Sequence, residues 1–99
     1  DLELEEMTIR PDIIGFEEAT TEFYFIESKV TPINLTNIGQ TIGYCQVADP
    51  EEAFLISTED LSRSVIRAIS HNRDILKFGK NKEIKFAKLT NDRVKEITV

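Results

Sequence analysis

The fold is decided by one segment, Phe23–Val30, which reads Phe-Tyr-Phe-Ile-Glu-Ser-Lys-Val. Five of its eight residues are strongly strand-forming apolar types, and this predicts a buried central β-strand. Glu27 and Lys29 interrupt the apolar run, although charged side chains are normally excluded from a strand interior. Because side chains alternate across a strand, Glu27 and Lys29 point to the same face. They form either a structural ion pair or part of a reactive site.

A second strand is predicted just before this segment. Pro11 fits the start of a strand because it has no backbone N–H, and Asp12 then opens a short strand over Ile13–Phe16. The polar residues Glu17–Glu22 predict the loop that returns the chain. The two strands should pair as an antiparallel hairpin, which brings Asp12 back towards the charged pair.

The order Pro-Asp, hairpin, Glu-x-Lys resembles the PD-(D/E)XK nuclease superfamily, which has the restriction-endonuclease-like fold. The resemblance covers the chain from Arg10 to Thr58. It implies that Asp12 and Glu27 bind one or two Mg²⁺ (or Mn²⁺) ions and that Lys29 orients or activates the attacking water. These residue types suit that chemistry, because hard cations prefer carboxylate oxygens and a bound metal lowers the pKa of its water. An ammonium group beside the water favours its hydroxide form.

The same tripeptide pattern occurs again at Glu83-Ile84-Lys85. This second copy follows no Pro-Asp hairpin and lies among further lysines, so we interpret it as a solvated strand face. The alternative interpretation of Glu27 and Lys29 themselves is an ion pair on a sheet edge, which would add little stability.

Composition limits the function classes. The chain has 99 residues, enough for one small domain over residues 1–99, and it can be a fragment of a longer chain. It has no apolar run of about 18 residues, so no membrane span is expected. Cys45 is the only cysteine, which is typical of the reducing cytoplasm, and we expect it to be a small core residue.

Charge argues against one class of partner. The 12 basic and 18 acidic residues give a net charge of −6, which disfavours a general nucleic-acid coat because phosphate binding depends on Lys and Arg. A nuclease is compatible with this charge, since a bound Mg²⁺ supplies positive charge where it is needed.

A helix is predicted after the central strand, from Pro32 to Ala48. Thr31 and Pro32 form a helix-start pattern, a hydroxyl N-cap followed by proline at the first helical position. Apolar residues at spacings of three and four should pack on the sheet, namely Leu35, Ile38, Ile42 and Cys45.

Gln40 and Tyr44 lie four residues apart on a different face of this helix. A Gln followed by an aromatic residue resembles the auxiliary motif of RecB-like and archaeal branches of the same superfamily. The resemblance implies that Gln40 helps to position substrate or the site water, with Tyr44 beside it. By helical periodicity both point away from the apolar stripe, towards solvent or a cleft. The alternative is a polar outer helix face.

A second strand–helix unit should follow. Ala53–Ile56 predicts a buried strand that pairs in parallel with the central strand, since a strand–helix–strand unit normally crosses over in this way. Ser57 or Thr58 should then cap a helix, with Glu59 and Asp60 in its first turn. Its buried side comprises Leu61, Val65, Ile66, Ala68 and Ile69.

The C-terminal quarter is rich in lysine and predicts a hairpin. Ile84–Leu89 alternates as a strand, residues 90–92 form a turn, and Arg93–Val99 returns as the partner; a short helix from Thr90 is the alternative. The lysines here either form a rim for the DNA backbone or protect an exposed strand edge. The residues that we predict to contact nucleic acid are Arg10, Arg63, Arg67, Lys82 and Lys85. For the two helical arginines the alternative is a solvated helix face.

Together these features predict one α/β domain with a mixed central sheet flanked by helices. It resembles a restriction-endonuclease-like core that lacks the usual N-terminal helix, for which there is no room before Arg10. The leading function is metal-dependent cleavage of DNA, with Asp12, Glu27 and Lys29 as the central residues. The partner class implied is DNA, with a homodimer or a larger parent chain to hold it. The alternatives are a non-catalytic nucleic-acid-binding or assembly module that keeps this fold, and a plain α/β domain in which Glu27 and Lys29 are structural.

Overall fold

A computed structural model describes residues 13–17 and 22–99 of the chain. Their elements follow in the order β1 (Ile13–Glu17), β2 (Glu22–Lys29), α1 (Leu35–Ala48), β3 (Glu52–Ser57), α2 (Arg63–His71), the 3-10 helix η2 (Arg73–Leu76), β4 (Lys77–Phe78), β5 (Lys82–Thr90) and β6 (Arg93–Ile97). The predicted α/β class is confirmed. None of the helices in this part of the chain combines the length and apolar character needed to cross a bilayer.

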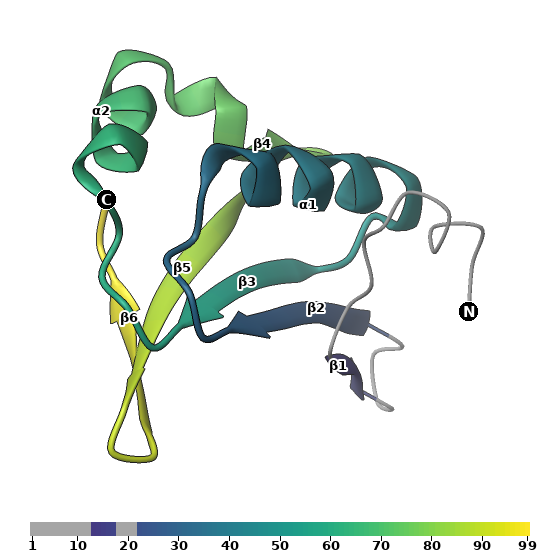
Figure 1. The fold of residues 1–99 in the computed structure, drawn as a ribbon. Coiled ribbons are helices and arrows are strands. Elements are labelled where there is room, and N and C mark those ends of the chain that lie inside the picture. Colours follow the sequence, from purple (N-terminus) through teal and green to yellow (C-terminus); the bar gives the residue numbers. More distant parts are fainter. Residues whose placement is uncertain (1–12, 18–21) are drawn as a thin grey trace.

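The strands form one mixed sheet in the order β1-β2-β3-β5-β4, and β6 also pairs with β5 (Figure 1). The predicted N-terminal hairpin is confirmed, because β1 and β2 pair antiparallel from Ile13 opposite Ile26 to Glu17 opposite Glu22. The predicted parallel pairing of the next strand is confirmed as well, since β2, β3 and β5 all run in the same direction.

A single core lies on one face of this sheet. Along β3, burial alternates strictly, with Ala53, Leu55 and Ser57 buried and the residues between them partly exposed. Both long helices contribute to the cluster on the buried face, through Ile38 and Tyr44 of α1 and through Val65 and Ile69 of α2. Figure 1 shows α1 and α2 on the same side of the sheet. In the described part of the chain, the helices therefore cover one face of the sheet and do not flank it on both.

The first helix begins three residues later than predicted, at Leu35. Its N-cap is Asn34, whose side chain accepts the Asn37 backbone N–H at 2.7 Å while the Asn34 backbone N–H donates to the Asn37 side chain at 2.9 Å. Thr31 is not the cap, because the chain bends at residues 30–31 and stays non-helical up to Asn34, with Ile33 buried at 1% exposure. The end at Ala48 is as predicted, closed by Asp49 in the left-handed conformation with φ 51°.

The second helix also begins later than predicted, at Arg63 with Ser62 as its N-cap. Ser57 does not cap it because Ser57 ends β3 in a buried position. There its hydroxyl donates to the Thr31 carbonyl at 2.7 Å and accepts the Glu59 N–H at 2.9 Å. The predicted buried side is wrong at Ile66, which is 48% exposed.

The C-terminal hairpin is confirmed, and the alternative of a short helix from Thr90 is wrong. Strands β5 and β6 pair antiparallel from Phe86 opposite Ile97 to Thr90 opposite Arg93. The two residues between them, Asn91 and Asp92, both have positive φ, at 49° and 64°. Two left-handed residues in a two-residue loop match the twist of the flanking strands, and Asn and Asp adopt this conformation more readily than most residues.

The observed cap predicts the effect of two matched substitutions. Asn34→Ala should lower the free energy of unfolding by about 1 kcal/mol, because it leaves the Asn37 backbone N–H without its acceptor. Thr31→Ala should change it by less than about 0.5 kcal/mol, because only the backbone carbonyl of Thr31 is used and alanine keeps it. Urea denaturation measures both values. A larger loss for Thr31→Ala than for Asn34→Ala would contradict this position of the cap.

Candidate active site

Glu27 and Lys29 form an ion pair at the carboxyl end of β2. The Lys29 Nζ lies 3.3 Å from the Glu27 Oε2, and the two side chains are 28% and 13% exposed, respectively. β2 is an internal strand, with β1 on one side and β3 on the other. At the pair itself, β3 lies on one side through Leu55 and Ser57, whereas the described pairing with β1 ends at Ile26. The pair is largely shielded from solvent. The described residues do not test the interpretation of the pair as a sheet-edge contact.

The pair occupies the rim of the core face. Phe25 precedes it on that face and is 0% exposed. In the next strand, the Cα partners of Glu27 and Lys29 are the buried residues Leu55 and Ser57. The core face thus changes from apolar to charged over the last three residues of β2. In α/β sheets, the region outside the carboxyl ends of parallel strands is where ligands usually bind.

The prediction that Tyr44 points away from the core is wrong. It is 2% exposed, and its ring packs on Phe25 with 4.6 Å between the centroids. Burial raises the pKa of Tyr44. The prediction failed because α1 is rotated relative to the expected apolar stripe, so that Thr41 and Tyr44 are buried while Leu35 is 48% exposed. Cys45 is a core residue as predicted, and burial raises the pKa of its thiol to about 12.

Gln40 is partly exposed and lies one helical turn before Tyr44. Since β2 and β3 are parallel and α1 connects them, α1 runs back antiparallel to β2. Starting from the contact between Tyr44 and Phe25, the helix rises about 6 Å from Tyr44 back to Gln40. The strand advances about 6.6 Å in the same direction, from Phe25 to Glu27. The helix and strand geometry therefore places Gln40 at the level of Glu27.

The implied metal ligands are only partly within the described residues. Asp12 lies outside them, so Glu27 is the one predicted metal ligand whose position is known. Arg10, a predicted nucleic-acid contact, lies outside them as well. Within residues 24–99, no group of three or more His, Cys, Asp or Glu side chains gathers as a metal site. A carboxylate at the carboxyl end of a central strand suits a hard cation such as Mg²⁺ in its chemistry.

The predicted nucleic-acid contacts do not gather around Glu27. Lys82 lies at the start of β5, at the opposite edge of the sheet, and binds the Asp49 carboxylate at 2.9 Å. Lys85 is on the face opposite to Glu27, because its Cα partner is Phe54 and not Leu55. It pairs with Glu52 at 3.6 Å. Arg63 and Arg67 are exposed on α2.

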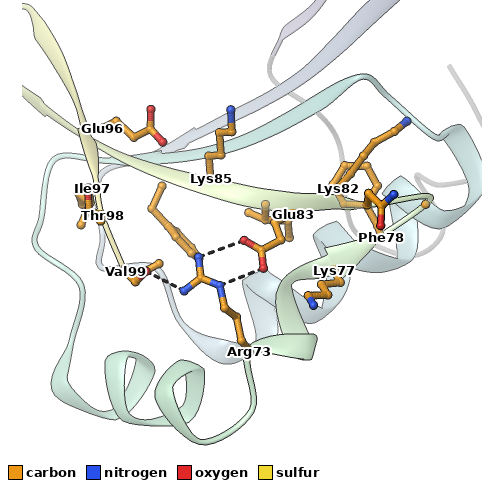
Figure 2. Close-up of a pocket in the computed structure, with 14 residues that line it drawn as sticks. Arg73, Lys77, Phe78, Lys82, Glu83, Lys85, Glu96, Ile97, Thr98 and Val99 are labelled. Carbon is orange, nitrogen blue, oxygen red and sulfur yellow. Dashed lines mark hydrogen bonds and ion pairs between the residues drawn. The ribbon is translucent and has the colours of Figure 1, made fainter.

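The second Glu-x-Lys copy has partners of its own. Arg73 donates to both carboxylate oxygens of Glu83, at 2.9 and 3.0 Å, and to the Val99 carbonyl at 2.7 Å (Figure 2). The hydrogen bond to Glu83 raises the pKa of Arg73. Arg73 lies in a hollow of about 730 Å³ along β5, which neither Glu27 nor Lys29 lines. The Glu83 carboxylate is therefore engaged in a structural contact with Arg73.

Lys88 was not selected from the sequence, yet it lies at the same edge of the sheet as Lys29. The Cα partner of both residues is Ser57, one through β2 and the other through β5. The alternation of side chains along β5 could have predicted the face on which Lys88 lies. Its position in line with Lys29 could not have been predicted, because it depends on the parallel register of three strands that are far apart in the chain.

Comparisons of this chain with protein-family models, with curated proteins and with solved structures find no match. The family resemblance of the sequence motif is thus neither supported nor opposed by relatives. Function has to be argued from the position and chemistry of the residues at the carboxyl end of β2.

The packing of Tyr44 predicts a difference between two substitutions. Tyr44→Phe keeps the ring against Phe25, so it should change the free energy of unfolding by less than about 1.5 kcal/mol. Tyr44→Ala removes a buried aromatic ring and should cost about 3–5 kcal/mol. Urea denaturation of the two variants beside the wild type tests this. An equal loss in both would mean that the hydroxyl group, and not the ring, is what the core requires.

Proposed function

We propose that this chain is a metal-dependent nuclease that hydrolyses phosphodiester bonds in DNA. The observation that carries the proposal is the shielded Glu27–Lys29 pair at the carboxyl end of an internal strand. A pair of this kind is weak support for stability, because the cost of removing two charges from water offsets much of their attraction. A reactive site accounts for an acid and an amine at this position.

The observed hairpin supports the pairing on which the role of Asp12 depends. Ile13, the residue after Asp12 in the sequence, lies opposite Ile26, the residue before Glu27. In the proposed site, Asp12 and Glu27 hold Mg²⁺ or Mn²⁺. The metal supplies a water of lowered pKa and neutralises negative charge on the phosphate.

The other site residues act through hydrogen bonds, charge and packing. Lys29, within 3.3 Å of Glu27, adds a positive charge that favours the ionised carboxylate and the hydroxide form of a nearby water. Gln40, at the level of Glu27 on α1, has an amide that can donate to substrate oxygens or to the water. Tyr44 positions α1 against Phe25 and is a positioning residue in this proposal.

The proposal predicts that cleavage depends on metal and on Glu27. The assay incubates end-labelled linear, single-stranded and branched DNA with millimolar Mg²⁺ or Mn²⁺. Glu27→Gln should reduce the cleavage rate by at least roughly 100-fold, since it removes a charge needed at the reacting centre, and EDTA should abolish cleavage. Glu83→Gln is the matched control, because it makes the same change in the other Glu-x-Lys copy, where Arg73 holds the carboxylate. It should cleave at the wild-type rate.

Two results would contradict the proposal. The first is cleavage by Glu27→Gln at the wild-type rate, provided that thermal denaturation shows both proteins folded. The second is absence of cleavage by the wild type together with no metal binding in a calorimetric titration. The second result would favour the non-catalytic binding or assembly module, in which the same ion pair is structural.

A further inference from the structure

A row of polar and charged side chains crosses the sheet at the carboxyl ends of its parallel strands. Residues that are Cα partners in adjacent strands point to the same face. Successive partners, one each from β2, β3, β5 and β6, are Lys29, Ser57, Lys88 and Lys95. At about 4.8 Å between neighbouring strands, this row is about 14 Å long. It begins at the Glu27–Lys29 pair and ends on the outer strand.

The β5–β6 hairpin extends this row beyond the rest of the sheet. Pairing of β3 with β5 ends at Lys88, whereas β5 and β6 continue as a two-stranded arm (Figure 1). Thr90 and Arg93 are the next pair on the same face as Lys88 and Lys95. The opposite face of β6 carries Val94 and Glu96, and Asp92 lies in the turn. One face of the arm thus presents three cations and no carboxylate of its own strands.

Two of these cations are available for a ligand. Arg93 and Lys95 are exposed, and neither forms an ion pair with any residue in the described part of the chain. Lys88 binds the Asp60 carboxylate at 2.8 Å, but Asp60 is 82% exposed on a loop. All four residues line one hollow of about 900 Å³, and Glu96 lines it as well. The arm therefore forms one wall of a groove that carries three cations and two carboxylates.

Charges on β6, inward-pointing ones included, also protect an exposed strand edge. Edge protection does not require the two cations of β6 to share one face, and Arg93 and Lys95 both lie on the face that leads to Glu27. Arg and Lys are the usual phosphate ligands. Duplex DNA carries one phosphate per strand about every 3.4 Å along its axis, so a row of about 14 Å spans roughly four such steps.

We propose that this face of the β5–β6 hairpin, through Lys88, Arg93 and Lys95, binds phosphates of the strand that is cleaved at Glu27 and Lys29. The inference rests on the proposed function for the identity of the ligand. Binding and cleavage can nevertheless be measured separately, so the two can fail separately.

The experiment compares two double variants that each remove two positive charges, one pair on β6 and the other on β4 and the turn that leads into β5. Arg93→Gln with Lys95→Gln changes the arm. Lys77→Gln with Lys80→Gln is the control, because these exposed residues lie on β4 and its turn. Fluorescence anisotropy with a labelled single strand and its duplex, in EDTA to prevent cleavage, gives affinities over a series of salt concentrations.

The arm variant should bind the single strand roughly tenfold or more weakly at low salt. The slope of log affinity against log salt should become shallower by about 1.4, which corresponds to two lost phosphate contacts. The control should keep the wild-type slope. In the cleavage assay, the arm variant should raise KM and leave kcat close to that of the wild type, because the reacting groups are intact.

Equal weakening by both double variants would overturn the inference, since overall charge would then explain the effect. Wild-type affinity and slope in the arm variant would overturn it too, even if Glu27-dependent cleavage is observed. If the wild type binds through the arm but cleaves nothing, phosphate binding by Lys88, Arg93 and Lys95 stands, and the proposed function fails. Thermal denaturation checks that each variant is folded, which is expected for substitutions at exposed positions.

Discussion

The parallel register of β2, β3 and β5 is the constraint on which the rest of the structure depends. Parallel neighbours cannot be joined by a tight turn, so each connection has to cross the sheet through a helix. Both helices lie on one face and bury a single cluster there, with Phe25, Leu55 and Phe86 as successive strand contributions. The same register brings the carboxyl ends of the three strands to one edge. Residues from distant parts of the sequence thereby become neighbours, as Lys29 and Lys88 do on either side of Ser57.

The two Glu-x-Lys copies show that the face of the strand on which the charged residues lie decides their environment. Glu27 and Lys29 share the core face with Phe25, so they are partly shielded and have each other as partners. Glu83 and Lys85 take the opposite face of β5, because Ile84 and Phe86 are the buried residues of that strand. There Glu83 binds Arg73 and Lys85 binds Glu52, which are ordinary structural contacts. The same three-residue pattern thus has two different environments, and only one of them lies at a place where α/β sheets bind ligands.

Local patterns predicted the two hairpins and the longer strands, but neither the short strand β4 nor where the helices begin. The alternation around Glu27 and the turn at Asn91 are read by short-range rules, and both agree with the structure. The Thr31-Pro32 pattern satisfies a helix-start rule equally well, yet the chain stays non-helical through the buried Ile33 and the cap is Asn34. The orientation of Tyr44 likewise depends on how α1 packs on Phe25. The sequence of α1 alone does not determine this packing. Ligand pairing of Asp12 with Glu27 is a prediction that the described residues do not test.

A net charge of −6 is a poor guide to whether this domain can bind a polyanion. Several of its acids are engaged by cations in the sheet region, where Asp49, Glu52 and Glu83 bind Lys82, Lys85 and Arg73, respectively. These pairs neutralise the middle and the amino end of β5, which is where sequence alone suggested a basic rim. Salt screens the interactions of exposed charges beyond about one Debye length, roughly 8–10 Å at ordinary salt. A ligand is therefore affected mainly by the charges nearest to it. The proposed binding of a phosphate strand therefore depends on the local charge of the hairpin face, and not on the net charge of the chain.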